Sequence, residues 1–487
     1  MGIIQNYRAT GLIIADNEAR TFIQDDNWWA SEDVSLVKAD SDDFYGNVDQ
    51  RGMRVGALWQ PTESISWHAV YEHYEDSSAG GINTIDCEKA AERADGVDCE
   101  TYYGPGADEY AVAVNVPGNL DITMDSFRSN VRWDFSDSLA FIYNMGYAVQ
   151  DRSNLIDIDA GRNRWDMSMS ITDSENISYS HEFQLQSTGD GPLQWISGLF
   201  YFEETTDLNG YFLASQANAT FWRQPDRTIE AGAVFAQATY ALTDTVHLTI
   251  GGRYTEDQKS DEGGNNLSCE RDWSVEPEET GEYGCFPAYL PGRLNALSNN
   301  HFADSSIYTI TTYNDVSKSW SSSDFRVGLD YDLTDEVMLY AYVASGFKSG
   351  GLGDVVIQYE QDPETADYLY DDDGNKIVQQ VIDTSYDEEK VVTWELGAKG
   401  TVLDGRLNLT GTFFFSKYKD MQLAAPDTAY SFYAEERDDE GNLTGEITSE
   451  PHIIFLTKNA ANSQIMGLEL EFDWAPYPNG RINGFAT

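Results

Sequence analysis

The residues best suited to covalent chemistry are four cysteines. They form two close pairs, Cys87 with Cys99 and Cys269 with Cys285, and each pair lies in a polar segment rich in Gly and Asp. This arrangement favours a disulfide that closes one long loop in an oxidising compartment. A zinc site is the alternative, but it would need C-x-x-C spacing and nearby His, which neither pair has. We therefore predict a disulfide within each pair and no metal site.

Two other patterns have the residue types of a phosphate site or an acid–base pair, but one lacks the spacing and the other lacks the surroundings that the chemistry requires. The segment Gly346-Phe-Lys-Ser-Gly-Gly351 lacks the G-x-x-x-x-G-K-[ST] spacing of a P-loop, and no helical pattern follows it. Glu469 and Glu471 would share one strand face, yet nothing nearby supplies the apolar pocket that an acid–base pair requires. We expect neither an enzyme nor a cofactor.

Two acidic segments contain parts of a calcium-loop motif. They are Asp371-Asp-Asp-Gly-Asn375 and Asp438-Asp-Glu-Gly-Asn442. The first segment has Leu369 and Gln380 where an EF-hand loop needs carboxylates, and the second has Ile447 in place of the last Glu. Each segment therefore predicts a hairpin tip, with loosely held Ca²⁺ as the alternative.

The overall composition excludes several classes of protein. The formal net charge is -53, and a surface this acidic repels phosphate backbones, so we expect no nucleic-acid partner. Aromatic residues make up 13% of the chain, which disfavours disorder. No run approaches the ~18 consecutive apolar residues of a membrane-spanning helix.

Alternation of apolar and polar residues is the main structural signal. Along residues 127–135 the odd positions are Phe, Ser, Val, Trp and Phe, and the even positions are Arg, Asn, Arg and Asp. Because a β-strand directs successive side chains to opposite faces, this run predicts a strand with one apolar and one polar face. The same pattern recurs along residues 246–254, 325–331, 392–399, 407–415 and 466–474.

Short turns alternate with long polar stretches between these runs. Hairpin-type turns occur at Asp134-Phe-Ser-Asp-Ser, Asp332-Leu-Thr-Asp-Glu and Leu403-Asp-Gly-Arg, among others. An outer-membrane barrel has this asymmetry, with short periplasmic turns and long extracellular loops. The long stretches are 77–120, 153–175, 207–228, 260–318, 349–388 and 422–461.

A two-layer β-sandwich is the alternative fold, since it also has alternating strands. It predicts strands of ~5–6 residues and buried faces of Val, Ile and Leu. Here many strands are longer, and Trp, Tyr and Phe lie near both ends of their apolar faces, as in the aromatic belts of a barrel. We predict an all-β, antiparallel transmembrane β-barrel and count about sixteen strands. Neither end closes the barrel, because the last predicted strand stops at Thr487.

Several segments resemble the barrel of TonB-dependent receptors. Residues 195–202 are similar to a family strand with a Trp, a Gly and aromatics, and residues 233–257 are similar to the most recognisable hairpin of the family. Residues 335–351 resemble the family strand that ends in Gly-Phe-Lys-Ser-Gly-Gly. Segments 395–400 and 459–471 fit later barrel strands, so the resemblance covers nearly the whole chain.

The resemblance implies a domain organisation and a function. The family barrel would have about 22 strands, so residues 1–487 are expected to be an incomplete barrel domain without the plug, the signal peptide and the C-terminal strands. The implied function is energised uptake of a scarce nutrient, most often a ferric siderophore or another iron complex, in the outer membrane of a Gram-negative bacterium. The implied partners are outer-membrane lipid, the ligand, and the TonB complex through the missing N-terminal region. A passive porin and a secreted β-rich adhesin are the alternatives.

The polar strand faces supply the candidate functional residues. In a plugged barrel, charged side chains on the lumen wall would hold the plug by ion pairs and hydrogen bonds, while aromatic and acidic loops would capture the ligand. The lumen candidates are Arg128, Arg132, Arg253, Arg326, Glu395, Lys399, Glu469 and Glu471.

Overall fold

The computed structural model describes residues 20–24, 36–38, 48–78, 111–114, 119–157, 168–215, 218–270, 308–374, 376–437, 443–477 and 479–487. Within these ranges the regular elements are β-strands, and there is no helix long and apolar enough to cross a membrane. The strands are β1 (Arg20–Gln24), β2 (Leu36–Lys38), β3 (Gln50–Thr62), β4 (Ile65–Ser78), β5 (Ala111–Val114), β6 (Asn119–Ser136), β7 (Leu139–Asp157), β8 (Ser168–Ser187), β9 (Leu193–Ser215), β10 (Asn218–Ala241), β11 (Val246–Glu270), β12 (Tyr308–Thr334), β13 (Val337–Lys348), β14 (Val355–Tyr359), β15 (Val378–Asp383), β16 (Glu389–Val402), β17 (Leu407–Arg437), β18 (Leu443–Tyr477) and β19 (Gly480–Ala486).

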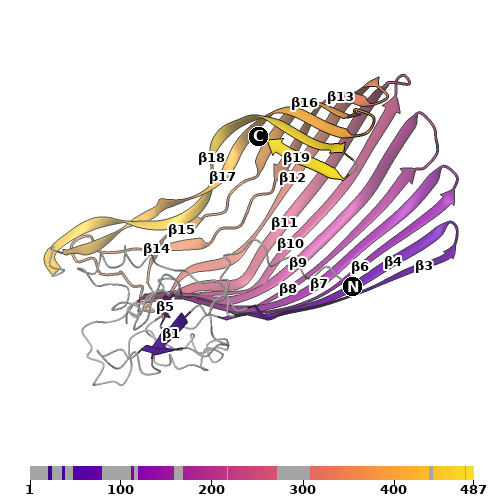
Figure 1. The fold of residues 1–487 in the computed structure, drawn as a ribbon. Helices are drawn as coiled ribbons and strands as arrows, with labels where there is room; N and C mark the ends of the chain where they lie inside the picture. The colour runs from indigo at the N-terminus through magenta and orange to yellow at the C-terminus, as the bar shows by residue number, and fades with distance from the viewer. Residues whose placement is uncertain are drawn as a thin grey trace.

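One antiparallel sheet contains most of these strands. It has 16 strands, of which fourteen follow the order β19-β18-β17-β16-β13-β12-β11-β10-β9-β8-β7-β6-β4-β3. The other two are the short strands β14, which pairs with β12, and β15, which pairs with β14. Figure 1 shows the sheet as a curved wall with strongly tilted strands. The predicted antiparallel barrel sheet of about sixteen strands is thus confirmed. A separate sheet has the order β2-β1-β5.

The sheet remains open along two edges. In the described part of the chain β3 pairs only with β4, and β19 pairs only with β18. All side chains of β3 are exposed, in keeping with an edge position. Figure 1 shows the two edge strands on opposite sides of the curved wall.

The two ends of the strands differ as expected for an outer-membrane barrel. At one end the connections are tight, such as residues 63–64 between β3 and β4 and residues 403–406 between β16 and β17. At the other end β17 and β18 form a hairpin that extends far beyond the rest of the sheet (Figure 1). The predicted asymmetry between short turns and long connections is therefore confirmed.

The predicted extent of the long loops was too large in several places, since parts of 153–175 and 260–318 also belong to paired strands. Two further cases are the largest. Residues 207–228 were expected to form a loop, but β9 and β10 pair almost to their shared end, with residues 216–217 outside the described part. Residues 422–461 belong largely to the paired strands β17 and β18. A strand with water on both faces can be polar on both faces, because backbone pairing does not need an apolar face. Such a strand has no alternation of apolar and polar residues by which it could be predicted.

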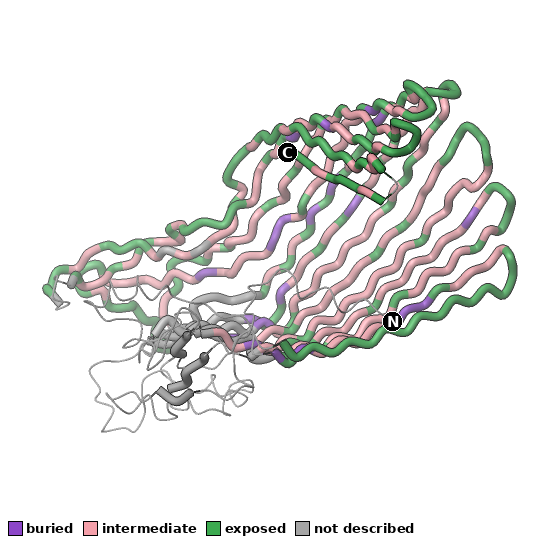
Figure 2. The backbone as a smooth tube through the Cα atoms, viewed as in Figure 1, coloured by how far each residue is buried: buried purple, intermediate pink, exposed green. Residues whose placement is uncertain are grey.

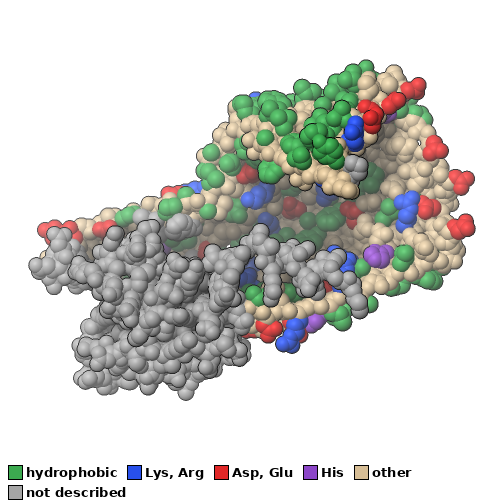
Figure 3. Space-filling view, viewed as in Figure 1, with side chains coloured by type: hydrophobic (Ala, Val, Ile, Leu, Met, Phe, Trp, Pro, Cys, Tyr) green, Lys and Arg blue, Asp and Glu red, His purple; other side chains and the backbone are tan. Residues whose placement is uncertain are grey.

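Strand register places the apolar positions of neighbouring strands side by side. Trp394 of β16 lies opposite Phe415 of β17, which lies opposite Met466 of β18. Large apolar side chains on this face are exposed, for example Leu396 and Leu468. Figure 2 shows that buried positions are sparse along the sheet, and Figure 3 shows apolar side chains on its outer surface and charged ones in its hollow. We call the apolar side the convex face and the polar side the concave face.

The tight turn after β16 is conformationally strained. Leu403, Asp404 and Gly405 all have positive φ, with values of 58°, 58° and 78°. A left-handed conformation costs a non-glycine residue about 1–2 kcal/mol, although Asp tolerates it better than Leu. The turn is still closed by a hydrogen bond from the Arg406 N–H to the Leu403 carbonyl, 3.3 Å long.

Replacing Leu403 by Gly is expected to stabilise the folded sheet by about 1 kcal/mol, because Gly adopts this φ without steric cost. The measurement is the free energy of unfolding in urea for the chain in detergent micelles. Leu193→Gly, in a strand without positive φ, is the control and is expected to destabilise. A loss of stability in Leu403→Gly would show that side-chain packing outweighs strain at this turn.

Candidate functional site

All eight lumen candidates lie on the concave face. In β6, Arg128 lies opposite Gly146, and Arg132 lies opposite Ile142. The cross-strand row of Arg132 continues through Gly198 and Phe235 to Arg253. Arg253 is followed in β12 by Asp324, two positions before Arg326. The cross-strand pairs of β13, β16, β17 and β18 continue the same face. The remaining candidates on it are Glu395 and Lys399 in β16 and Glu469 and Glu471 in β18.

On the β3–β7 part of the concave face, arginines are paired with carboxylates. Arg128 pairs with Glu72 of β4, and Arg54 of β3 also contacts Glu72, with 3.0 Å between Nη1 and Oε1. Arg132 donates to both carboxylate oxygens of Asp134 at 3.1 Å and 2.7 Å. The bidentate, charge-assisted contact of Arg132 holds its side chain in one orientation against the wall.

Three cations in the middle of the sheet lie on aromatic rings instead. Arg253 lies 5.5 Å and 5.7 Å from the ring centres of Phe200 and Phe235. Arg326 lies 4.1 Å from the ring centre of Tyr342. Within the described residues neither Arg253 nor Arg326 has an ion pair with a carboxylate. Lys399 behaves in the same way, 5.1 Å from the Tyr340 ring.

Glu395 accepts hydrogen bonds from two neighbouring tyrosines. The hydroxyl of Tyr340 donates to Oε1 over 2.8 Å, and that of Tyr342 donates to Oε2 over 2.5 Å. The Tyr340 hydroxyl also lies 2.9 Å from the Thr412 hydroxyl. This network connects β13, β16 and β17 across the concave face.

Glycines let several concave rings lie flat on the wall. A Cβ at Gly397 would lie 2.4 Å from Cζ of Tyr340, its direct cross-strand neighbour. Gly198 has the same relation to Phe235, with 2.6 Å to Cζ. A side chain at either glycine would push the ring into the hollow. The glycines therefore set the positions of the rings on which Arg253 and Lys399 lie.

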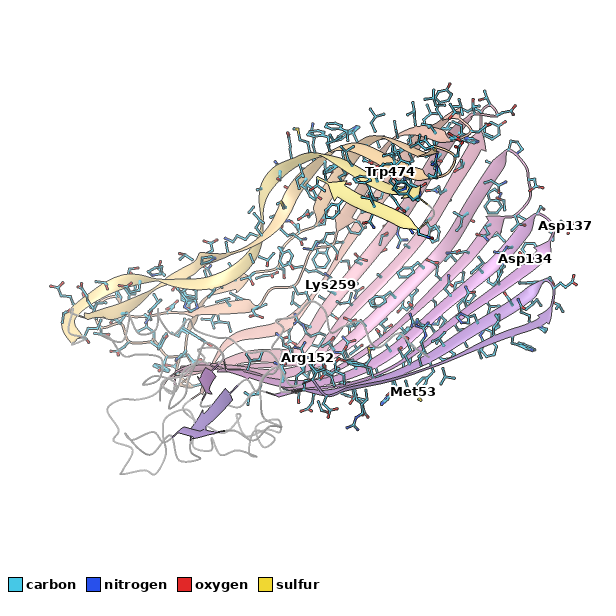
Figure 4. The ribbon with its side chains drawn as sticks, in the orientation of Figure 1. Met53, Asp134, Asp137, Arg152, Lys259 and Trp474 are labelled. Carbon is cyan, nitrogen blue, oxygen red and sulfur yellow. The ribbon has the colours of Figure 1, made fainter. Side chains whose placement is uncertain are left out.

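One lysine of the concave face contacts the backbone just beyond the end of β13. Lys259 of β11 donates a 2.7 Å hydrogen bond to the Gly350 carbonyl just beyond β13, and its Nζ lies 5.7 Å from the Trp320 ring. Figure 4 shows Lys259 in the hollow, away from the turn end marked by Asp134 and Asp137. A Cβ at Gly350 would lie 2.3 Å from the Trp320 ring. The segment Gly346–Gly351 thus has a packing role, which sequence spacing did not reveal.

An aromatic cluster lies beyond the barrel wall, between the β14–β15 connection and the β17–β18 hairpin. Tyr430 stacks on His452 with 4.7 Å between ring centres, and Lys376 lies 3.8 Å from the Tyr368 ring centre and 5.4 Å from that of Tyr359. Burial lowers the pKa of the His452 imidazole and of the Lys376 ammonium. Sequence reasoning assigned these segments only to loops, because their contacts join residues far apart in the chain.

A comparison with models of known protein families identifies the family of the chain. The family model described as the TonB dependent receptor-like β-barrel matches residues 70–487. The chain belongs to this family. No curated protein matches it.

Several solved receptors share the fold. The ferric yersiniabactin uptake receptor FyuA from Yersinia pestis has a TM-score of 0.54 at 14% identity, over 91% of this chain and 52% of that receptor. The ferric-catecholate import receptor Fiu from E. coli K12 has a TM-score of 0.51 at 16% identity, over 89% and 56%. The ferric preacinetobactin receptor BauA from Acinetobacter baumannii has a TM-score of 0.51 at 14% identity, over 90% and 53%. The chain therefore spans about half the length of these receptors.

The remaining predictions for this receptor barrel have mixed outcomes. The tip at residues 371–374 is a turn beside the Tyr370–Lys376 bridge, as predicted, whereas residues 438–442 lie outside the described part. Cys87, Cys99 and Cys285 also lie outside it, and of Cys269 only the backbone in β11 is described, so both disulfides stay predictions. Among the described residues no group of His, Cys, Asp and Glu could hold a metal ion.

The tyrosine–carboxylate network predicts a difference between two glutamates of the concave face. Glu395→Ala removes the acceptor of two hydroxyls and is expected to cost about 1.5–3 kcal/mol. Glu469→Ala is the matched control, since Glu469 has no hydrogen bond or ion pair within the described ranges, and its change is expected to stay within about 0.5 kcal/mol. Urea unfolding of both variants measures the difference, and equal effects would contradict the assigned role of Glu395.

Proposed function

We propose that this chain forms the wall of an outer-membrane receptor that imports a ferric siderophore or another iron complex with energy from the TonB complex. The observation that carries the proposal is the family match over residues 70–487. The receptors FyuA, Fiu and BauA, whose names specify ferric ligands, share its fold. Receptors of this family are transporters, so the wall would bind and orient without covalent chemistry.

The two faces support a membrane placement. The convex face exposes a continuous band of Leu, Phe, Trp and Val, which fits lipid, and the concave face carries the charged side chains, which fits a water-filled or protein-filled lumen. The short turns would lie in the periplasm, and the β17–β18 hairpin would lie outside the cell.

A longer receptor is part of the same proposal. Unpaired strand edges cannot face hydrocarbon, because their N–H and C=O groups would lack partners. The edges β3 and β19 would therefore be joined by further strands in a closed barrel. A longer receptor agrees with the comparison with the solved structures, since this chain covers only about half the length of FyuA and Fiu.

In the closed barrel, the eight candidates would contact a plug domain. Arg253, Arg326 and Lys399 are best placed, because rings rather than carboxylates hold them and their charges remain available. Glu469 and Glu471 would offer acceptors on the opposite part of the wall. Arg128 and Arg132 would contribute less, since they already form ion pairs with Glu72 and Asp134.

The function is tested in the source bacterium grown with iron complexes as the sole iron source. Deleting the gene is expected to abolish growth on at least one complex, and excess inorganic iron is expected to restore it. Loss of TonB is expected to reproduce the defect, because uptake through a plugged barrel needs energy. Uptake that persists without TonB would indicate a passive porin instead.

A further inference from the structure

Three lysines cluster on the convex face of β16 and β17. Lys390 and Lys419 are direct cross-strand partners, and Lys417 lies opposite Val392, one row nearer the turn end. All three are exposed, and the side chains of Lys390 and Lys419 are 50% and 72% accessible. They share the face of Trp394 and Phe415, not the face of the lumen candidates.

The cluster lies at the end of the apolar band. The rows below it contain Trp394 with Phe415 and Leu396 with Phe413, and the band continues to Leu407 near the turn. From Leu407 to Phe415 the strand rises roughly 20 Å along the barrel axis, close to the ~25 Å band of such barrels. In the proposed membrane placement, the lysines would therefore lie at the level of the headgroups of the outer leaflet.

This cationic patch is an exception on the convex face. The same level of β4 to β9 carries carboxylates, and these are bound by tyrosine and histidine side chains. Asp125 lies 2.9 Å from His73 and accepts a 2.5 Å hydrogen bond from Tyr71, and Glu203 accepts a 2.6 Å hydrogen bond from Tyr201. In a chain with 30 Lys and Arg against 83 Asp and Glu, three adjacent outward lysines need a specific explanation.

Local contacts only partly compensate the lysines. Lys390 pairs with Glu388 at 2.9 Å, and Lys419 with Asp420 at 3.6 Å. Lys417 has no carboxylate partner within the described residues, and its Nζ lies 5.7 Å and 5.6 Å from the ring centres of Trp394 and Phe415. Like charges directly across two strands destabilise a sheet, so an anion bound between Lys390 and Lys419 would relieve their repulsion.

We propose that Lys390, Lys417 and Lys419 bind the phosphate groups of a lipid in the outer leaflet. Charge complementarity and direct continuity with the apolar band favour a lipid, because its acyl chains would lie along Trp394 and Phe415 while its phosphates meet the ammonium groups. The inference rests on the proposed membrane placement but not on uptake, since lipid binding needs neither TonB nor a transported ligand.

The test compares lipid binding by the 487-residue chain in detergent micelles with that of a variant carrying Lys390→Gln, Lys417→Gln and Lys419→Gln. Native mass spectrometry would count bound lipid A, a glycolipid with two phosphates, and its dephosphorylated form. Each basic residue near an anionic surface contributes about a fivefold gain in affinity, so the triple variant is expected to bind lipid A about 100-fold more weakly. Dephosphorylated lipid is expected to bind the parent chain as weakly as lipid A binds the variant.

Matched variants separate the patch from net charge. Replacing Lys318, Lys348 and Lys458 by Gln changes the charge equally and is expected to leave lipid A binding unchanged, whereas three Lys→Arg replacements in the patch retain it. If the triple Gln variant does not fold, as judged by circular dichroism, Lys417→Gln alone is expected to lose about fivefold.

Three results would overturn the proposal. They are unchanged lipid A binding by the folded Gln variants, equal binding of the dephosphorylated lipid to the parent chain, and displacement of lipid A by an equal concentration of inorganic phosphate. The last result would identify free phosphate rather than lipid as the ligand. A transport defect with normal lipid binding would concern the proposed uptake alone.

Discussion

Backbone amides that face hydrocarbon must find their hydrogen-bond partners within the protein, and this requirement determines the form of the whole chain. Near the turn end, the antiparallel sheet satisfies it for every strand between its two edges β3 and β19. The same requirement explains why the strands can continue past the apolar band, as in β17 and β18, because pairing does not depend on what the side chains meet. Side-chain chemistry then differs completely between the two faces of one continuous backbone ladder.

The concave face shows how this ladder is made into a functional surface. Glycines such as Gly198 and Gly397 let cross-strand rings lie flat on the wall, and the rings in turn hold Arg253 and Lys399. Cations held on rings keep their charge available for a partner, because no carboxylate neutralises it. The arginines near β3 and β4 already contact the carboxylates of Glu72 and Asp134, so the wall has one region in which the cations are paired and one in which they lie only on rings.

Alternation along residues 127–135 and 466–474 predicted the strands, and the length of the strands, their aromatic ends and the asymmetry of their connections distinguished a barrel from a sandwich, because in lipid each strand must keep one apolar face along its whole membrane-crossing length. The same parity placed Arg128 and Glu471 on one face of the sheet, although their contact with a plug stays a prediction. The Lys259–Gly350 contact and the Gly397–Tyr340 pair were not predictable, since each depends on the register between strands. The extent of the β17–β18 hairpin was missed because strands outside lipid need no alternation.

The central claim is that one face of each strand meets lipid while the other meets the lumen. Spin labels placed one at a time along residues 465–472 of β18, in a variant with the four cysteines replaced by Ser, would measure it through collision with oxygen and with a water-soluble nickel complex. Labels at the even positions are expected to be accessible to oxygen and protected from nickel, as in hydrocarbon, and labels at Glu469 and Glu471 the reverse. Equal accessibility at successive positions would contradict the account.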